Sequence, residues 1–350
     1  MKDLSERQKF ILALVIRDYI ETAQPVGSAR LVDHYGLDVS SATVRNELMA
    51  LTEMGYLRQP HTSAGRVPSE EGYRYFVRQL MGHTELPDPT KRTITHQFYQ
   101  AGADIDRWMR LAVSVLAHQS QAASLITAPH PERAFFKHLE LINTHGRQVL
   151  MVLVLSGGDV SQQMLTLAEP VSQEQLSAVA QRFNTTCHGL DSDRIAQAAG
   201  GGPLAGLDAL EQDICKLVLD EMRRTEQAHT GELYRDGLTH VLAEPEFGEA
   251  TSARRALRIL EERPLLEDLL HRTVLTNDMR SVQVLIGGEG TWEELRECSM
   301  VLARYGAPGL ATGTLGVLGP MRMSYGRTIS TVRFMADLLS GLVEDMLTEE

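Results

Sequence analysis

Helical periodicity begins close to the amino terminus and is interrupted by short breaks. Ser5 and Gln8 form a capping-box sequence, and the apolar positions after them lie close to one helical stripe, which predicts a helix over residues 6–22. A second, shorter helix is expected to be capped by Ser28. It should stop at Gly36, because glycine adopts a left-handed conformation at little cost.

A third helix is predicted to start at Ser40 or Ser41 and to end before Gly55. Its apolar positions share one face because they recur at helical spacing. They are Val44, Leu48, Leu51 and Met54. The polar residues of its first turns therefore face outward. Extended pieces at 56–58 and 66–67 then surround a tip rich in glycine, proline and polar residues, which predicts a β-hairpin.

The rest of the chain changes periodicity several times. A helix over residues 70–81 is followed by a proline-containing linker at 82–91. Helical patterning is predicted at 91–124, 171–275 and 325–347, and strands at 136–143, 148–155, 160–167, 282–286, 298–305 and 310–318. The first three strands should form an antiparallel meander.

These elements predict an α+β protein. We expect a first domain at residues 1–81 and a sheet domain built from 92–184 and 281–350, interrupted by a helical insertion at 185–280. The pattern alone does not prove that the two groups of strands pair.

Charge is distributed unevenly along the chain. The net charge is −12, yet the first 80 residues hold 10 basic and 10 acidic side chains. Between Glu53 and Glu70 there is no acidic residue, while Arg58 and Arg66 flank the hairpin tip. An acidic protein does not bind nucleic acid over its whole surface, so any DNA contact must be local.

The first 80 residues therefore predict a winged helix-turn-helix, whose third helix enters the major groove while the hairpin lies on a neighbouring backbone or minor groove. Arginine and asparagine can bind base edges bidentately, and hydroxyl groups suit phosphate. The candidate DNA-binding residues are Ser40, Ser41, Thr43, Arg45, Asn46, Arg58, His61, Thr62, Ser63 and Arg66. Taken singly, each is also compatible with an ordinary solvated surface.

Several of these stretches resemble the bacterial heat-inducible transcription repressor HrcA family. The similar segments are residues 5–8, 18–22, 25–28, 40–47 and 59–68, and further along 286–289, 305–306, 313–323 and Tyr325. The resemblance implies a winged helix followed by a GAF-like domain that carries a helical dimerisation insertion. It also implies a homodimer that represses chaperone operons from an inverted-repeat operator, kept active by a GroEL-type chaperonin.

Dimerisation also agrees with the requirements of specificity, since one winged helix contacts only a few base pairs. Two apolar stretches of the predicted insertion could pair across a two-fold axis or could equally form the core of their own domain. The first is Ile214, Leu217, Val218 and Met222, and the second is Leu257, Ile259, Leu260, Leu265, Leu266 and Leu269.

Other functional classes find little support in the sequence. The three cysteines, Cys187, Cys215 and Cys298, are too far apart for a metal motif, and the histidines show no ligand spacing. Catalytic and nucleotide-binding motifs are absent, so we expect neither an enzyme nor a cofactor. The amino terminus lacks a signal-peptide pattern, which favours a cytoplasmic protein that has no membrane partner. The alternative function is a regulator whose GAF-like domain senses a small molecule.

Overall fold

The computed structural model describes residues 4–350, apart from 62–63, 83, 103, 132, 157–159, 203, 228–231, 249–254, 256–257, 263–264, 267–268, 271–280, 288–292, 309 and 349–350. The chain divides into two compact units. Unit 1 comprises Met1–Pro129, Glu232–Gly306 and Gly313–Glu350, and unit 2 comprises His130–Gly231 and Ala307–Thr312.

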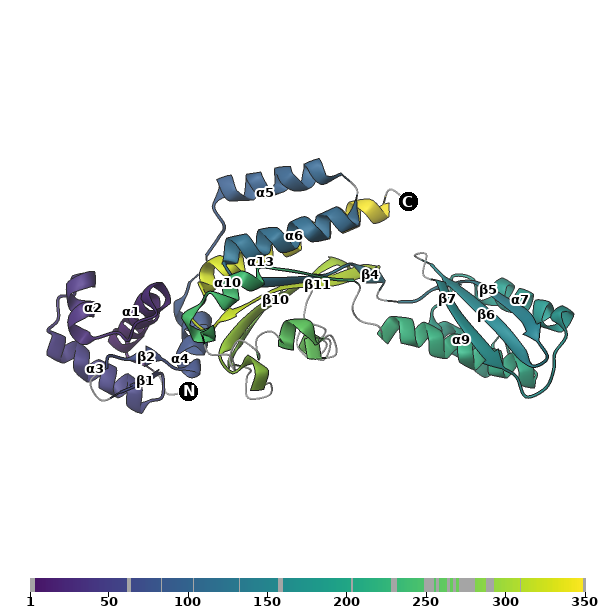
Figure 1. The fold of residues 1–350 in the computed structure, drawn as a ribbon, viewed down its shortest axis with the longest axis horizontal. Helices are drawn as coiled ribbons and strands as arrows, with labels where there is room; N and C mark the ends of the chain where they lie inside the picture. Colours follow the sequence, from purple (N-terminus) through teal and green to yellow (C-terminus); the bar gives the residue numbers. More distant parts are fainter. Residues whose placement is uncertain are drawn as a thin grey trace. The chain divides into compact units, whose positions relative to one another are not determined.

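The amino-terminal part of unit 1, here called the N-terminal bundle, contains helices and one small hairpin (Figure 1). Its elements are α1 (Glu6–Thr22), α2 (Ser28–Tyr35), α3 (Ser41–Glu53), β1 (Leu57–Arg58), β2 (Val67–Pro68), α4 (Glu70–Tyr75) and the π-helical turn η1 (Phe76–Leu80). The predicted helices and the hairpin are confirmed. Serine side chains cap α1, α3 and α4.

The expected capping role of Ser28 is wrong. Ser28 is the first residue of α2, and the capping position is occupied by Gly27, which offers no side chain to the helix. Serine is a frequent cap, but the chain reaches helical conformation one residue earlier than the sequence indicates. The predicted stop at Gly36 is confirmed, with a left-handed φ of 59°.

The linker is shorter than predicted, because α5 (Asp88–Ala101) already begins within the expected linker region. Pro89 lies in its first turn, where proline is tolerated. Helix α6 (Ile105–Ser120) ends at Gln121, whose φ of 52° is left-handed although it is not glycine. The strand β3 (Ala123–Thr127) was not predicted: its first two residues fall at the end of the expected helix, and the others were assigned to no element. All its residues are buried, so it shows no alternation.

Strand β3 lies inside the sheet of unit 1, in the order β8, β3, β11, β10, β9. The other members are β8 (Leu233–Asp236), β9 (Val282–Ile286), β10 (Cys298–Ala307) and β11 (Ala311–Pro320), and β4 (His130–Pro131) pairs with the start of β11. β3 is antiparallel to both β8 and β11, and β9 is antiparallel to β10.

Helices cover the sheet of unit 1. Helix α6 packs on β3 and on α13 (Tyr325–Thr348) (Figure 1). A separate apolar core joins the strands to α10 (Leu238–Leu242), the 3-10 turn η2 (Pro245–Phe247) and residues between 259 and 270. A second 3-10 turn, η4 (Glu293–Leu295), precedes β10. The observed class is thus α+β with antiparallel sheets, as expected.

Unit 2 has its own sheet and core. The predicted meander is confirmed as β5 (Phe136–His145), β6 (Gln148–Leu155) and β7 (Val160–Thr166). Helices α7 (Gln173–Cys187), α8 (Ser192–Gly201) and α9 (Ala209–Gln227) share one core with its inner face. Among the described strands the meander does not pair with β9, β10 or β11. The contact-defined boundary therefore falls at residues 130–231 and includes the meander, which differs from the insertion expected at 185–280.

Two arginines join the N-terminal bundle to the sheet within unit 1. Arg74 donates from Nη2 to the carbonyl oxygen of Ile286 at 2.9 Å. Arg322 donates from Nη1 to the carbonyl oxygen of Ile20 in α1 at 3.5 Å, and it also forms ion pairs with Glu244 and with Glu246, the latter at 2.6 Å. Both arginine side chains are largely buried. These contacts attach α4 to the edge strand β9 and fix the turn after β11.

Candidate nucleic-acid interface

Helix α3 and its capping residue Ser40 carry five of the ten predicted contact residues. Ser40 accepts a hydrogen bond from the Thr43 amide at 3.1 Å, so the helix begins with a satisfied cap. The predicted apolar side is confirmed for Val44, Leu48 and Leu51, which are buried. That packing leaves Ser41, Arg45 and Asn46 exposed, while Thr43 is half-buried.

The hairpin is fastened to the loop before α2 by backbone contacts. Val26 and Arg66 exchange two backbone hydrogen bonds, both of 2.8 Å. Gly65 makes this approach possible, because a Cβ atom there would lie 2.5 Å from the carbonyl carbon and oxygen of Val26. The residue type is therefore set by the closeness of two backbones. The contact places the hairpin beside the start of α2.

The arginines of this region are not neutralised by nearby carboxylates. Within the described part of the chain, no ion pair is formed by Arg45, Arg58 or Arg66. The Nε of Arg66 donates to the hydroxyl of Thr52 at 2.9 Å, and this partner is uncharged. The local positive charge expected from the sequence is thus free to attract an anion.

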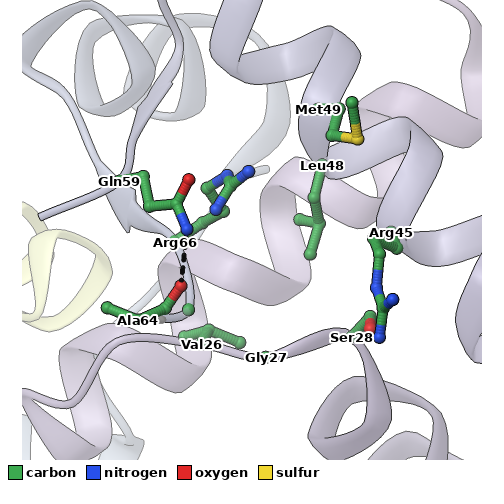
Figure 2. Close-up of a pocket in the computed structure, with 10 residues that line it drawn as sticks. Val26, Gly27, Ser28, Arg45, Leu48, Met49, Gln59, Ala64 and Arg66 are labelled. Atoms are coloured by element: carbon green, nitrogen blue, oxygen red, sulfur yellow. Dashed lines mark hydrogen bonds between the residues drawn. The ribbon is translucent and has the colours of Figure 1, made fainter. Parts of the chain in front are cut away.

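A cleft of about 430 Å³ lies between α3, the start of α2 and the hairpin (Figure 2). Its lining residues are Val26, Gly27, Ser28, Arg45, Leu48, Met49, Gln59, Ala64, Gly65 and Arg66. None of them is acidic. The cleft brings together two predicted residues, Arg45 and Arg66, that lie 21 positions apart in the sequence.

Eight of the ten lining residues were not predicted as contact residues, and three of them bear on the chemistry of the cleft. Met49 is 47% exposed although it is large and apolar, and it follows Arg45 by one helical turn. Its helical spacing could have identified it. Gln59 donates to the carbonyl oxygen of Ala64 at 3.1 Å and so closes the hairpin. Ser28 lies next to the hairpin only because of the Val26 and Arg66 pairing, which has no local sequence signal.

The other predicted residues that the structure describes do not line the cleft. Asn46 is exposed on α3, one position beyond Arg45. Arg58 is exposed on β1 and lies close enough to Tyr19 to lower the pKa of that phenol, although burial of Tyr19 raises it overall. His61 is exposed near the hairpin tip, while Thr62 and Ser63 lie outside the described residues.

Two features that other functions would need are missing from the part of the chain that the structure describes. No group of three or more His, Cys, Asp or Glu side chains is placed to hold a metal ion within the described ranges. In the same part of the chain, no helix combines the length and the apolar character needed to cross a bilayer. The thiols of Cys187, Cys215 and Cys298 are buried.

Comparison with known proteins identifies relatives over nearly the whole chain. The family model described as the HrcA protein C terminal domain matches residues 106–329. A heat-inducible transcription repressor HrcA from Roseiflexus castenholzii is 45% identical, covering 98% of this chain and 96% of the relative. The repressor of the same name from Herpetosiphon aurantiacus is 43% identical, covering 99% and 97%.

One solved structure has a similar fold. It is a crystal structure described only as a hypothetical protein, and it matches with a TM-score of 0.58 and 23% identity over 98% of both chains. The identity is too low to carry more than fold. The sequence relatives are close enough to decide the family, and the chain belongs to the HrcA family of heat-inducible transcription repressors.

Proposed function

We propose that this chain represses chaperone genes by binding an inverted-repeat operator through a winged helix-turn-helix. In this proposal α2 and α3 form the helix-turn-helix, α3 is the recognition helix, and the β1–β2 hairpin is the wing. The observation that carries the proposal is the exposed face of α3 beside a hairpin whose arginines lack acidic partners among the described residues.

The chemistry of this surface suits double-stranded DNA. Ser41 and Asn46 stand on a helix that is narrow enough for the major groove, and Asn46 has the donor and acceptor pair that matches adenine. Arg58 and Arg66 supply charge on the hairpin for the phosphate backbone. With a chain net charge of −12, binding should be confined to this surface and should weaken steeply with salt.

A homodimer would place two such surfaces on the two halves of an operator. The apolar residues first considered for the dimer contact belong to other cores. Ile214, Val218 and Met222 are buried against the unit 2 sheet, and Ile259, Leu260, Leu266 and Leu269 are buried in unit 1. Leu257 lies outside the described residues.

The outer face of the unit 2 sheet is a better candidate for the dimer contact. Cross-strand pairing places Ile142, Leu150 and Met164 in one row of that face, and Val154 and Val160 in another. Ile142, Met164 and Val160 are 41%, 53% and 55% exposed. His138 completes the second row, and Glu140, Val152 and Gln162 form the row between the two. Exposed apolar side chains with polar residues among them are typical of a protein interface, so we assign the homodimer to this face.

The name of the relatives indicates the stimulus that controls repression, which is heat. Proteins named heat-inducible repressors cover the whole of this chain, so we propose that heat relieves its repression. A GroEL-type chaperonin is the proposed partner that keeps the repressor active, and the cytoplasm is the proposed location. The GAF-like domain corresponds to the β8, β3, β11, β10, β9 sheet with its covering helices.

A ligand-sensing function for that domain is the second candidate. A cleft of about 410 Å³ beside β3 and β8 is lined by polar residues that include Arg235, Asp236 and Thr239. A metabolite bound there would raise the thermal stability of the protein in a saturable way. A broad metabolite screen without any such shift would count against it.

The decisive experiment is a footprint of the purified protein on genomic fragments upstream of chaperone genes, with and without added chaperonin. Protection of a palindrome that strengthens with chaperonin is the expected result. The variant Arg45→Ala with Asn46→Ala should lose this protection while its circular dichroism spectrum stays unchanged. Undiminished protection by that double variant would contradict the assignment of α3.

A further inference from the structure

The start of α2 is an open group of hydrogen-bond donors. Gly27 gives the helix no side-chain cap, and the first helical bond runs from the Leu31 amide to the Gly27 carbonyl oxygen. The amides of residues 28–30 therefore have no acceptor within the helix. Partial positive charge at such a helix start favours an anion, but this feature alone does not define a site.

The side chain of Ser28 provides the second observation. Ser28 is only 8% exposed, and its hydroxyl forms no hydrogen bond with any residue that the structure describes. The residue lines the cleft, where an entering ligand could accept or donate to the hydroxyl. The hydroxyl oxygen itself is not fully buried. It is the accessible polar group of an otherwise buried residue that lines the cleft, so it is available to a ligand that enters there.

Helix α3 contributes a positive charge beside Ser28 and the first amides of α2. Arg45 lines the same cleft, and its guanidinium extends toward Ser28 in Figure 2. No carboxylate of the described residues pairs with Arg45. Asn46, the next residue, does not line the cleft. The two neighbouring side chains of α3 thus face different surroundings.

We propose that Ser28, the first amides of α2 and Arg45 hold one phosphodiester of the DNA backbone, which leaves Asn46 to contact a base. The proposal rests on the proposed DNA-binding function and adds a role for each residue. A phosphodiester carries one negative charge and two free oxygens. One oxygen would accept from the amides and the Ser28 hydroxyl, and the other from the guanidinium. The Val26 and Arg66 pairing keeps the wing against this site.

The test uses the full-length protein and the DNA fragment that it protects. Phosphates across one half-site are replaced singly by neutral methylphosphonates. One replacement should weaken wild-type binding about tenfold, the loss expected for a charge-assisted contact. The same replacement should have a clearly smaller effect on Ser28→Ala and on Arg45→Gln than on the wild type, because each variant has already lost one contact to that phosphate while the others remain.

Three further variants separate this role from others. Arg17→Gln removes an equal charge from an exposed position of α1 outside the cleft and should keep the full methylphosphonate effect. Asn46→Ala should also keep it but should lose discrimination between operator and altered sequence. The melting temperature of Ser28→Ala should be unchanged or raised, because the hydroxyl it removes has no partner among the described residues.

Two results would overturn the proposal while DNA binding stands. One is a full methylphosphonate effect at every phosphate in both Ser28→Ala and Arg45→Gln. The other is saturable stabilisation by inorganic phosphate that Ser28→Ala abolishes, with no methylphosphonate effect, because the site would then hold free phosphate. If the wild-type protein protects no fragment at all, the proposed function fails and this assignment fails with it.

Discussion

Arg66 of the hairpin donates a hydrogen bond from Nε to the hydroxyl of Thr52, at a distance of 2.9 Å. Thr52 lies in the last turn of α3. Thr52 in turn donates to the carbonyl oxygen of Leu48 at 2.7 Å. A neutral partner orients Arg66 without cancelling its charge. The wing and the recognition helix of the proposed interface are therefore linked by a side chain that is still able to bind phosphate.

Replacement of Thr52 by valine should release Arg66 from this orientation. Valine keeps the shape of threonine but cannot accept a hydrogen bond, so the fold should persist. We expect affinity for operator and for unrelated DNA to fall by a similar factor of about three to ten, as for the loss of one hydrogen bond. Arg66→Ala should weaken binding to both kinds of DNA more strongly than Thr52→Val does. It should also lower the slope of log affinity against log salt concentration by about one.

A double-mutant cycle checks this coupling. If Thr52 acts only by orienting Arg66, then Thr52→Val should have no effect on DNA affinity in the Arg66→Ala background. Equal losses from Thr52→Val with and without Arg66 would show that the two residues act independently.

Gly65→Ala should displace the hairpin. The added methyl group would lie 2.5 Å from backbone atoms of Val26, and backbone cannot move aside as a flexible side chain does. We expect a loss of about 1 to 3 kcal/mol in stability, as for overpacked sites, and weaker DNA binding. Differential scanning calorimetry and gel-shift titration measure the two effects.

Gly341→Ala is the matched control for this change. Gly341 lies in α13 and an added Cβ atom there has no neighbour within 4 Å. Alanine also favours helix over glycine, so this variant should be as stable as the wild type or more so. A Gly65→Ala protein that behaved like Gly341→Ala would contradict the close contact of hairpin and loop.

Asn46→Ala should change the sequence preference of the protein. An asparagine bound to a base contributes about 1 to 3 kcal/mol of discrimination, so affinity for the operator should fall by that amount. Affinity for unrelated DNA should hardly change, because no phosphate contact is lost. Binding titrations on operator and scrambled duplexes at one salt concentration distinguish this from a general loss.

Much of the N-terminal bundle could be predicted because its signals are local. Ser5 with Gln8, the glycine at 36 and the serine at 40 each mark a helix end within a few residues. The same local spacing identified the outer face of α3. By contrast, β3 was missed because the helix before it ends at a left-handed glutamine, a residue that gives no warning of such a turn.

The pairings between distant segments could not be predicted. Extended segments separated by turn sequences identified β5, β6 and β7, but such local signals do not say which distant strands become neighbours. The cleft was missed for a similar reason, since Ser28 and Arg66 meet through a backbone bridge that depends on Gly65. Local patterns therefore indicated which residues are exposed, while the site they form required the tertiary structure.

Charge placed on the outer face of the unit 2 sheet should separate the proposed dimer. Met164→Glu with Val160→Glu introduces two carboxylates among residues that are apolar and more than half exposed. We expect a monomer by light scattering, and operator affinity should fall because the two half-sites are no longer bound together.

The control for the dimer test is Tyr99→Glu. Tyr99 is an aromatic residue of α5 in unit 1 and is 85% exposed, so its replacement adds charge away from the unit 2 sheet. This variant should remain dimeric. If the double variant of the sheet also remained dimeric at micromolar concentration, the dimer contact would have to lie elsewhere.

Burial of the cysteines predicts a defined response to alkaline pH. Burial raises the pKa of the Cys187 thiol to about 12, with a smaller contribution from Cys215, and burial also raises that of Cys298 to about 12. The reactive species is the thiolate, so at pH 8 only about one native thiol in ten thousand is reactive at these two positions. A thiol reagent should therefore label them slowly in the native protein and rapidly in denaturant.

The same shifts determine how stability changes with pH. An unfolded cysteine ionises near pH 8.5, below the native pKa of about 12, so the native state binds more protons in that interval. The stability contributed by the neutral thiols is thus complete below about pH 8.5 and is lost as the pH rises toward 12. Cys298→Ala should flatten the fall of the melting temperature above pH 9, and an unchanged slope would show that this thiol does not contribute.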